Sequence, residues 1–194
     1  MLAPVAPHTA EEVWSRLGLK GLVASARWPV ADEKLDDSLA EQAESLVGDV
    51  LEDTGEILKA TGMSPKQVSF YTAAGWKWQV YRRALEAAGS EGMDQGGFIR
   101  TVMGDSELRG LGKQAADYAA RVFQQARGMG EEQRKARLGT GLLKEKEVLA
   151  GAADFFRREL KAEVRVWAED EDSVVDPKGR ARLAEPYRPA IFLE

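Results

Sequence analysis

The stretch KQVSFYTAAGWKWQVYRRALEAAG, residues 66–89, decides the fold. Its first half alternates Val68 and Phe70 with Ser69 and Tyr71, and this period of two predicts a half-buried β-strand. After a glycine, apolar side chains recur at every third or fourth position, which predicts a helix of about fourteen residues. A strand that leads directly into a helix is typical of an α/β or α+β unit.

The flanking segments extend this pattern. Residues 38–60 place apolar side chains at intervals of three and four, which predicts a long amphipathic helix. Further along, a helix is predicted over 142–160 and alternating strands near 162–169 and 190–193. The polar run at 128–147 predicts no definite element.

We therefore expect a mostly helical α+β chain with two parts. Residues 1–60 are expected to form the first, helical part. Residues 61–194 are expected to form a small α+β domain with a roughly three-stranded sheet built from strands near 67–73, 162–169 and 190–193. A chain of 194 residues is long enough for one domain or two small ones.

The composition excludes several classes of protein. The sequence has no cysteine, which rules out disulfides, thiolate zinc sites and iron–sulfur clusters. A single histidine, His8, rules out a multi-histidine metal site. No apolar run approaches the roughly 20 residues that cross a bilayer, so we expect no membrane partner and a cytoplasmic location.

The charge is unevenly placed along the chain. Residues 1–60 carry 5 basic and 12 acidic side chains, whereas residues 61–194 carry 22 basic and 20 acidic ones. The net charge of −5 argues against a protein that coats nucleic acid by bulk charge. Any contact with nucleic acid is therefore expected to be local.

Catalytic constellations are scarce. Gly110-Leu111-Gly112-Lys113 lacks the spacing and the hydroxyl of a phosphate-binding loop. The segment 139–144, GTGLLK, suits either a phosphate cradle or a flexible helix start. His8 beside Glu11 and Glu12 suits either an acid–base cluster or a capping role.

Aromatic and basic side chains interleave at Trp76, Lys77, Trp78, Tyr81 and Arg82. On a helix these residues divide between faces, so that one face can pack while another touches phosphate or stacks on a base. Spacing alone leaves packing and RNA contact both open.

Two stretches carry a resemblance to a known family. APVAPHTAEEVWSRLG at 3–18, followed by ARWPVADE at 26–33, resembles the anticodon-binding bundle of class I aminoacyl-tRNA synthetases, where A-P-H-x-x-E-E-x-W is followed by W-P. The remainder resembles the carboxy-terminal region of leucyl-tRNA synthetases of the archaeal and eukaryotic cytosolic type. The residues that carry this second resemblance are Leu46–Val50, Val68–Tyr71, Trp76-Lys77 and the ending Pro189–Glu194.

The resemblance implies a piece of a longer enzyme, in which residues 1–60 form a partial anticodon-binding helical bundle and residues 61–194 form the carboxy-terminal tRNA-binding domain. The class signatures H-I-G-H and K-M-S-K-S are absent from this sequence, so no catalytic site and no cofactor are expected here. ATP and leucine would bind the catalytic domain, which lies outside this segment. The expected partners are tRNA(Leu) and the remainder of the synthetase chain, with no DNA.

The resemblance further implies contacts with the tRNA body and the long variable arm. The matched pair Trp76 and Lys77 and the terminal segment Ile191, Phe192, Leu193 and Glu194 are the expected RNA contacts. Basic character near these elements adds Arg82, Arg83, Arg180, Arg182 and Arg188.

Two other functions remain open at this point. A protein-docking module of a synthetase complex would use the acidic first sixty residues as its surface. A small enzyme would depend on an acid–base site around His8.

Overall fold

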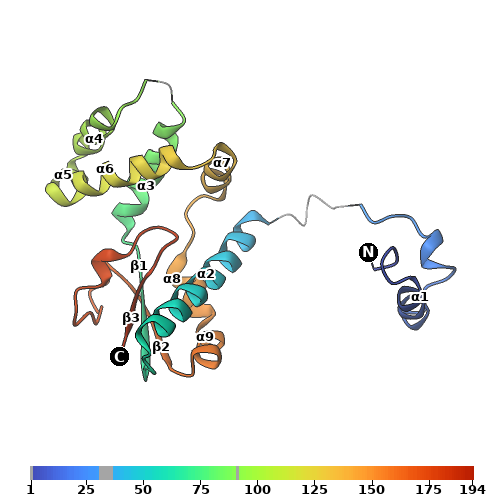
Figure 1. Ribbon diagram of the computed structural model, residues 1–194. Helices are drawn as coiled ribbons and strands as arrows, with labels where there is room; N and C mark the ends of the chain where they lie inside the picture. The colour runs from blue at the N-terminus through green and yellow to red at the C-terminus, as the bar shows by residue number, and fades with distance from the viewer. Residues whose placement is uncertain (1, 31–36, 91) are drawn as a thin grey trace. The chain divides into compact units, whose positions relative to one another are not determined.

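The computed structural model describes residues 2–30, 37–90 and 92–194 (Figure 1). The chain forms two compact units, Met1–Asp37 and Ser38–Glu194. The two compact units therefore divide at residue 37, within the range 1–60 that the sequence assigns to the first part. The reason is α2 (Ser38–Thr61), whose apolar face carries Leu46 and Val50 into the core of the second unit.

The first unit contains α1 (Pro7–Arg16) and the 3-10 helix η1 (Val23–Ser25). Pro7 starts α1, where the missing amide hydrogen costs nothing. The Glu11 carboxylate accepts the backbone N–H groups of Val23 and Ala24 at 3.0 and 3.2 Å, which ties η1 to α1. A cavity of about 320 Å³ lies between these elements and is lined mainly by apolar side chains, Trp14 and Trp28 among them.

The second unit contains a three-stranded sheet in the order β2-β1-β3. The strands are β1 (Gln67–Thr72), β2 (Glu163–Ala168) and β3 (Ala190–Leu193). β1 pairs in parallel with β2 and antiparallel with β3. The central position suits β1, because this strand is buried along nearly all its length.

Helices form two groups around this sheet (Figure 1). The first group lies beside the strands. The second group, which begins with α3, lies beyond the ends of the strands. The first group is α2, α8 (Glu145–Gly151) and α9 (Ala153–Leu160). The second group is α3 (Gly75–Ala88), α4 (Gln95–Gly104), α5 (Ser106–Gly110), α6 (Lys113–Gly128) and α7 (Glu131–Thr140). Among the described residues, no helix has both the length and the apolar character that crossing a bilayer requires.

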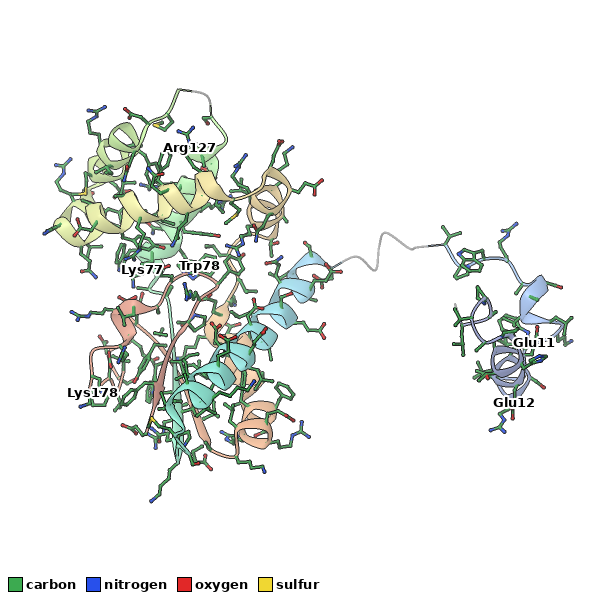
Figure 2. The ribbon with its side chains drawn as sticks, viewed as in Figure 1. Glu11, Glu12, Lys77, Trp78, Arg127 and Lys178 are labelled. Atoms are coloured by element: carbon green, nitrogen blue, oxygen red, sulfur yellow. The ribbon has the colours of Figure 1, made fainter. Side chains whose placement is uncertain are left out.

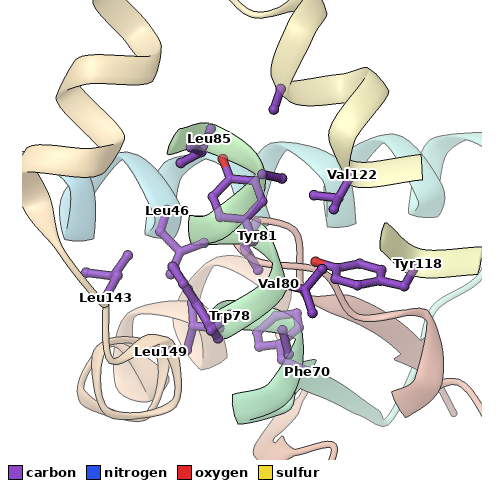
Figure 3. Close-up of a cluster of buried hydrophobic side chains, with 14 of the residues drawn as sticks. Leu46, Phe70, Trp78, Val80, Tyr81, Leu85, Tyr118, Val122, Leu143 and Leu149 are labelled. Atoms are coloured by element: carbon purple, nitrogen blue, oxygen red, sulfur yellow. The ribbon is translucent and has the colours of Figure 1, made fainter. Parts of the chain in front are cut away.

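A mostly helical α+β fold is confirmed, but several local expectations are corrected. The polar run at 128–147, for which the sequence predicts no definite element, contains α7. The single helix expected over 142–160 is two helices, because the backbone leaves helical geometry at Ala152. Leu149 of α8 and Phe156 of α9 are both fully buried in the core (Figure 3 shows Leu149).

The expectation that β1 is half-buried is wrong, since Ser69 and Tyr71 on its second face are also buried. The connection between β2 and β3 folds back over that face and includes the 3-10 helix η3 (Ala181–Leu183). Tyr71 Oη donates a hydrogen bond of 2.8 Å to the carbonyl of Val175 in this connection. The long connection between β2 and β3 therefore covers the face of β1 that the alternating sequence pattern assigns to solvent.

The start of α3 is held by three carboxylates from other elements. α3 has no side-chain cap of its own, although the first N–H groups of a helix need acceptors. Glu145, Glu169 and Asp170 accept the N–H groups of Ala73, Ala74 and Gly75 at 3.4, 3.3 and 2.9 Å respectively. The helix dipole favours negative charge at this end, so α3 is fixed to α8 and to the turn after β2.

Lys77 completes this arrangement from inside the core. Its ammonium group donates to the carbonyls of Arg182 and Ala184 at 2.8 and 2.7 Å and pairs with Glu169 at 2.7 Å. The residue is 3% exposed, and these three acceptors match its three N–H donors. Lys77 thus joins α3 to η3 and to the turn after β2 (Figure 2).

Removing the Lys77 charge should destabilise the second unit strongly. We expect Lys77→Met to lower the free energy of unfolding by about 3–5 kcal/mol, because Glu169, whose side chain is only 12% exposed, would lose its cation and the carbonyls of Arg182 and Ala184 would lose their donor. Urea denaturation followed by tryptophan fluorescence measures this change. The control Arg82→Met removes an exposed cation from the same helix and should cost under about 1 kcal/mol. Equal losses in the two variants would contradict the structural role of Lys77.

Glu145 should give the stability a distinct pH dependence. Burial raises the pKa of Glu145 to about 7, against about 4.3 for an unfolded glutamate. The folded state therefore binds the proton more tightly, so the contribution of Glu145 to stability falls as pH rises from about 4.3 to 7, by up to about 1.4 kcal/mol per pH unit.

Glu145→Gln should remove this slope, which urea denaturation at pH 4.5, 5.5, 6.5 and 7.5 measures. The exposed neighbour Glu147, changed to Gln, is the control and should leave the slope unchanged. An identical slope in the wild type and in Glu145→Gln would refute the assignment.

Candidate nucleic-acid interface

The matched pair at the start of α3 has a structural role. Trp76 is partly buried and packs edge-on against Tyr118, with ring centroids 5.3 Å apart. Lys77 has all its donors occupied inside the protein. The expected contact between Lys77 and RNA conflicts with this position, because a phosphate would have to displace three internal acceptors.

The two arginines further along α3 differ in their surroundings. Arg82 is exposed and lies 3.4 Å from Glu86 on the same helix. Arg83 donates to Asp105 at 2.7 Å, and this hydrogen bond holds the pKa of Asp105 below its usual range. Since Asp105 also caps α5, Arg83 braces α3 against α5, and Arg82 is the more available of the two.

Arg180 and Arg182 are exposed on the connection that covers the sheet. The Asp176 carboxylate accepts the backbone N–H groups of Arg180 and Ala181 at 2.8 and 2.7 Å. The carbonyl of Arg182 is one of the acceptors for Lys77. The backbone of this basic segment is therefore fixed at two points, while its guanidinium groups remain open to solvent.

Arg188 is exposed on a tight turn just before β3. Glu185 and Arg188 exchange backbone hydrogen bonds of 3.0 and 2.8 Å across this turn. Tyr187 inside the turn has a φ of 63°, a left-handed conformation that a non-glycine residue adopts at a cost of about 1–2 kcal/mol. Its backbone N–H donates to Glu145 at 2.5 Å, which holds the turn in place.

The terminal segment is part of the sheet. Ile191 and Leu193 pack against the large core, and Phe192 faces the cluster around Tyr71 on the opposite side. Glu194 is exposed and its side chain accepts a hydrogen bond of 3.0 Å from Gln67. Most of this segment is thus partly buried, and Glu194 is its most accessible member.

Sequence reasoning missed a cluster of one arginine and two tyrosines, which is formed by Arg137, Tyr81 and Tyr187. The Arg137 guanidinium lies 4.6 Å from the centre of the Tyr187 ring and donates to the Tyr81 hydroxyl. Burial raises the pKa of Tyr187 to about 12. Arg137 belongs to the run without a predicted element, so only the aromatic and basic letters of PYRP at 186–189 signalled this cluster.

Two adjoining cavities, of about 380 and 270 Å³, border this cluster. Both are lined by Asp49 of α2, by Arg137 of α7 and by Tyr187. The first also reaches Arg188. The structure therefore places one of the predicted residues, Arg188, beside a groove that the sequence did not predict.

The acid–base site considered around His8 does not assemble. His8 is exposed in the first turn of α1, Glu11 is bound to the amides of η1, and Glu12 pairs with Arg16 at 2.5 Å. Lys144, at the end of the segment GTGLLK, pairs with Glu147 at 3.0 Å. Within the described part of the chain, no group of three or more His, Asp or Glu side chains is arranged to hold a metal ion.

Comparisons with known proteins bear on the whole chain. A family model described as the anticodon-binding domain of tRNA ligase matches residues 1–71. The full chain aligns with the leucine–tRNA ligases of Methanococcoides burtonii at 35% identity, Methanosarcina acetivorans at 33% and Halobacterium salinarum at 36%. In each alignment the chain is covered completely but spans only 20% of the relative.

The matched part of these relatives is their carboxy-terminal region. Residues 1–71 include α1, α2 and most of β1, so the anticodon-binding match extends from the first unit into the second. Over its whole length the chain is therefore similar to the carboxy-terminal region of leucine–tRNA ligases.

Proposed function

We propose that this chain is a tRNA-recognition segment of a leucine–tRNA ligase, which contacts the body and the long variable arm of leucine tRNA. The observation that carries the proposal is the alignment of the entire chain with leucine–tRNA ligases, together with the anticodon-binding match over 1–71. In this proposal ATP, leucine and the ligation reaction belong to other parts of the longer enzyme.

The surface of the second unit offers cations suited to this role. Arg180, Arg182 and Arg188 are exposed, and in the described ranges no carboxylate lies within ion-pairing distance of their side chains. Both segments that carry them are fixed in place, because their backbone N–H groups donate hydrogen bonds to the carboxylates of Asp176 and Glu145. Cations on a rigid support lose little conformational freedom when they bind phosphate.

The charge distribution limits where RNA can lie. The outer face of α2 carries Glu41 and Glu44, both exposed, and would repel the phosphate backbone. RNA is therefore expected to approach over the basic connection and the turn before β3. A protruding hairpin suits such a small contact, since looped RNA is recognised by its shape and its unpaired bases.

The acidic face of α2 is also the feature that would favour the protein-docking alternative. A basic partner protein would be attracted to this helix, whereas RNA would be attracted to the arginines. The two functions thus use different residues of the second unit, and substitutions separate them.

Binding should depend on the long variable arm and on these arginines. We expect the chain to bind a tRNA with a long variable arm more tightly than one with a short arm, with affinity that falls between 50 and 200 mM salt. Changing Arg180, Arg182 and Arg188 together to Gln should reduce affinity about tenfold and lower the salt slope by about one unit per lost phosphate contact. Fluorescence anisotropy measures both quantities.

The control changes three exposed cations elsewhere, Arg100, Lys113 and Arg158, to Gln. This variant has the same net charge and should keep the preference for the long arm. Equal affinity of the wild type for both tRNAs, or equal losses in the two triple variants, would reject the proposed contact surface.

A further inference from the structure

The groove between α2, α7 and the turn at 185–188 has the properties of a binding site for one planar group. Its two cavities, of about 380 and 270 Å³, share Asp49, Arg137 and Tyr187. The combined space lies between elements that are far apart in sequence but belong to the same compact unit. A nucleoside is of a size that such a cavity accepts.

Arg137 forms a fixed planar platform in this groove. One face of its guanidinium covers the Tyr187 ring at 4.6 Å, and its orientation is set by the hydrogen bond to the Tyr81 hydroxyl. Tyr187 is itself held by edge-on contact with Trp78, with centroids 5.2 Å apart. Arg137 is partly exposed and lines both cavities, so a flat group can stack on it.

The opposite wall supplies hydrogen-bond acceptors. Asp49, Glu52 and Asp53 of α2 line the larger cavity, and Asp49 lines the smaller one as well. In the described part of the chain, none of these three carboxylates forms a side-chain hydrogen bond or an ion pair. These three exposed carboxylates therefore line the groove without a protein donor.

We propose that this groove binds an unpaired guanine base of the RNA, stacked on Arg137 and recognised through its Watson–Crick edge by Asp49. Guanine presents two adjacent donors on that edge, N1–H and the N2 amine, which match the two oxygens of a carboxylate. Adenine, cytosine and uracil each present one donor there. This inference rests on the proposed RNA binding and adds a base preference to it.

The groove also explains how an acidic wall is compatible with RNA binding. Arg188 lines the same cavity and is exposed, so it is available to the phosphate of the bound nucleotide. A neutral base donates hydrogen bonds to the carboxylates, while the charged backbone remains on the side of Arg188. A base with acceptors alone on its contacting edge would be repelled.

Titration of the full 194-residue chain with free nucleotides tests the base preference. We expect GMP to bind at least tenfold more tightly than AMP, CMP or UMP in NMR or calorimetric titrations. IMP, which lacks the N2 amine, should bind several-fold more weakly than GMP. Equal affinity for GMP and IMP, or for all four nucleotides, would overturn the proposal.

The variant Asp49→Asn gives changes of opposite sign for different ligands. It should weaken GMP binding about tenfold, because an amide cannot accept both donors, and it should leave or slightly improve the binding of UMP, because a negative charge is lost. The control Glu44→Gln removes the same charge from the outer face of α2 and should affect all nucleotides equally. If Asp49→Asn also affects all nucleotides equally, its carboxylate acts only by repulsion and the proposal fails.

Two further measurements distinguish guanine recognition from general RNA binding and from protein docking. An RNA hairpin that reproduces the long variable arm is titrated in parallel, in two forms. One form retains a guanosine in its loop, and the other has inosine in its place. Binding of the hairpin without any effect of inosine rejects the guanine site while the proposed RNA binding stands; no binding of either hairpin rejects the proposed function itself. Binding of an arginine-rich peptide that requires Asp49 and excludes GMP would assign the groove to a basic protein segment and reject the inference.

Discussion

The backbone amides of Ala73, Ala74 and Gly75 determine how the second unit is assembled. Each donates a hydrogen bond to the carboxylate of a residue 72 or 95 positions away, and Lys77 pairs with one of these carboxylates, Glu169, from within the core. Carboxylates at a helix start are favoured by the dipole, and a buried lysine among them limits their mutual repulsion. The sheet, the helical group that begins with α3 and the connection that covers Tyr71 therefore meet at one small polar site.

This polar site also decides which residues remain for function. A helix start is a common place for phosphate, but here internal carboxylates fill it, so Trp76 and Lys77 serve the fold. Exposed cations are found instead on segments that the same site holds in place, because Lys77 binds the carbonyl of Arg182 and Glu145 binds the turn that carries Arg188. The structural and the proposed RNA-binding residues are thus neighbours with separate tasks.

The sequence predicted most elements of this fold but few of its long-range contacts. Periodicity located α2, α3 and all three strands, because local side-chain patterns follow the buried face. It did not predict that Ser69 and Tyr71 are buried, since the covering connection lies about a hundred positions further along the chain. Nor did it identify Arg137, whose proposed role depends on stacking against Tyr187 rather than on any local motif. The burial of Lys77 was not predictable, because a basic residue beside tryptophans has the same sequence pattern whether it is buried or exposed.

The parallel pairing of β1 with β2 has a consequence for how the molecule is made. Val68 lies opposite Val164, so the central strand finds its first parallel neighbour only after some ninety further residues have been synthesised. During translation, the apolar side chains of β1 must be sheltered in some other way, and helices α3 to α6, which contact one another locally, are available earlier. Ribosome-bound intermediates of increasing length should then contain a helical cluster well before any sheet.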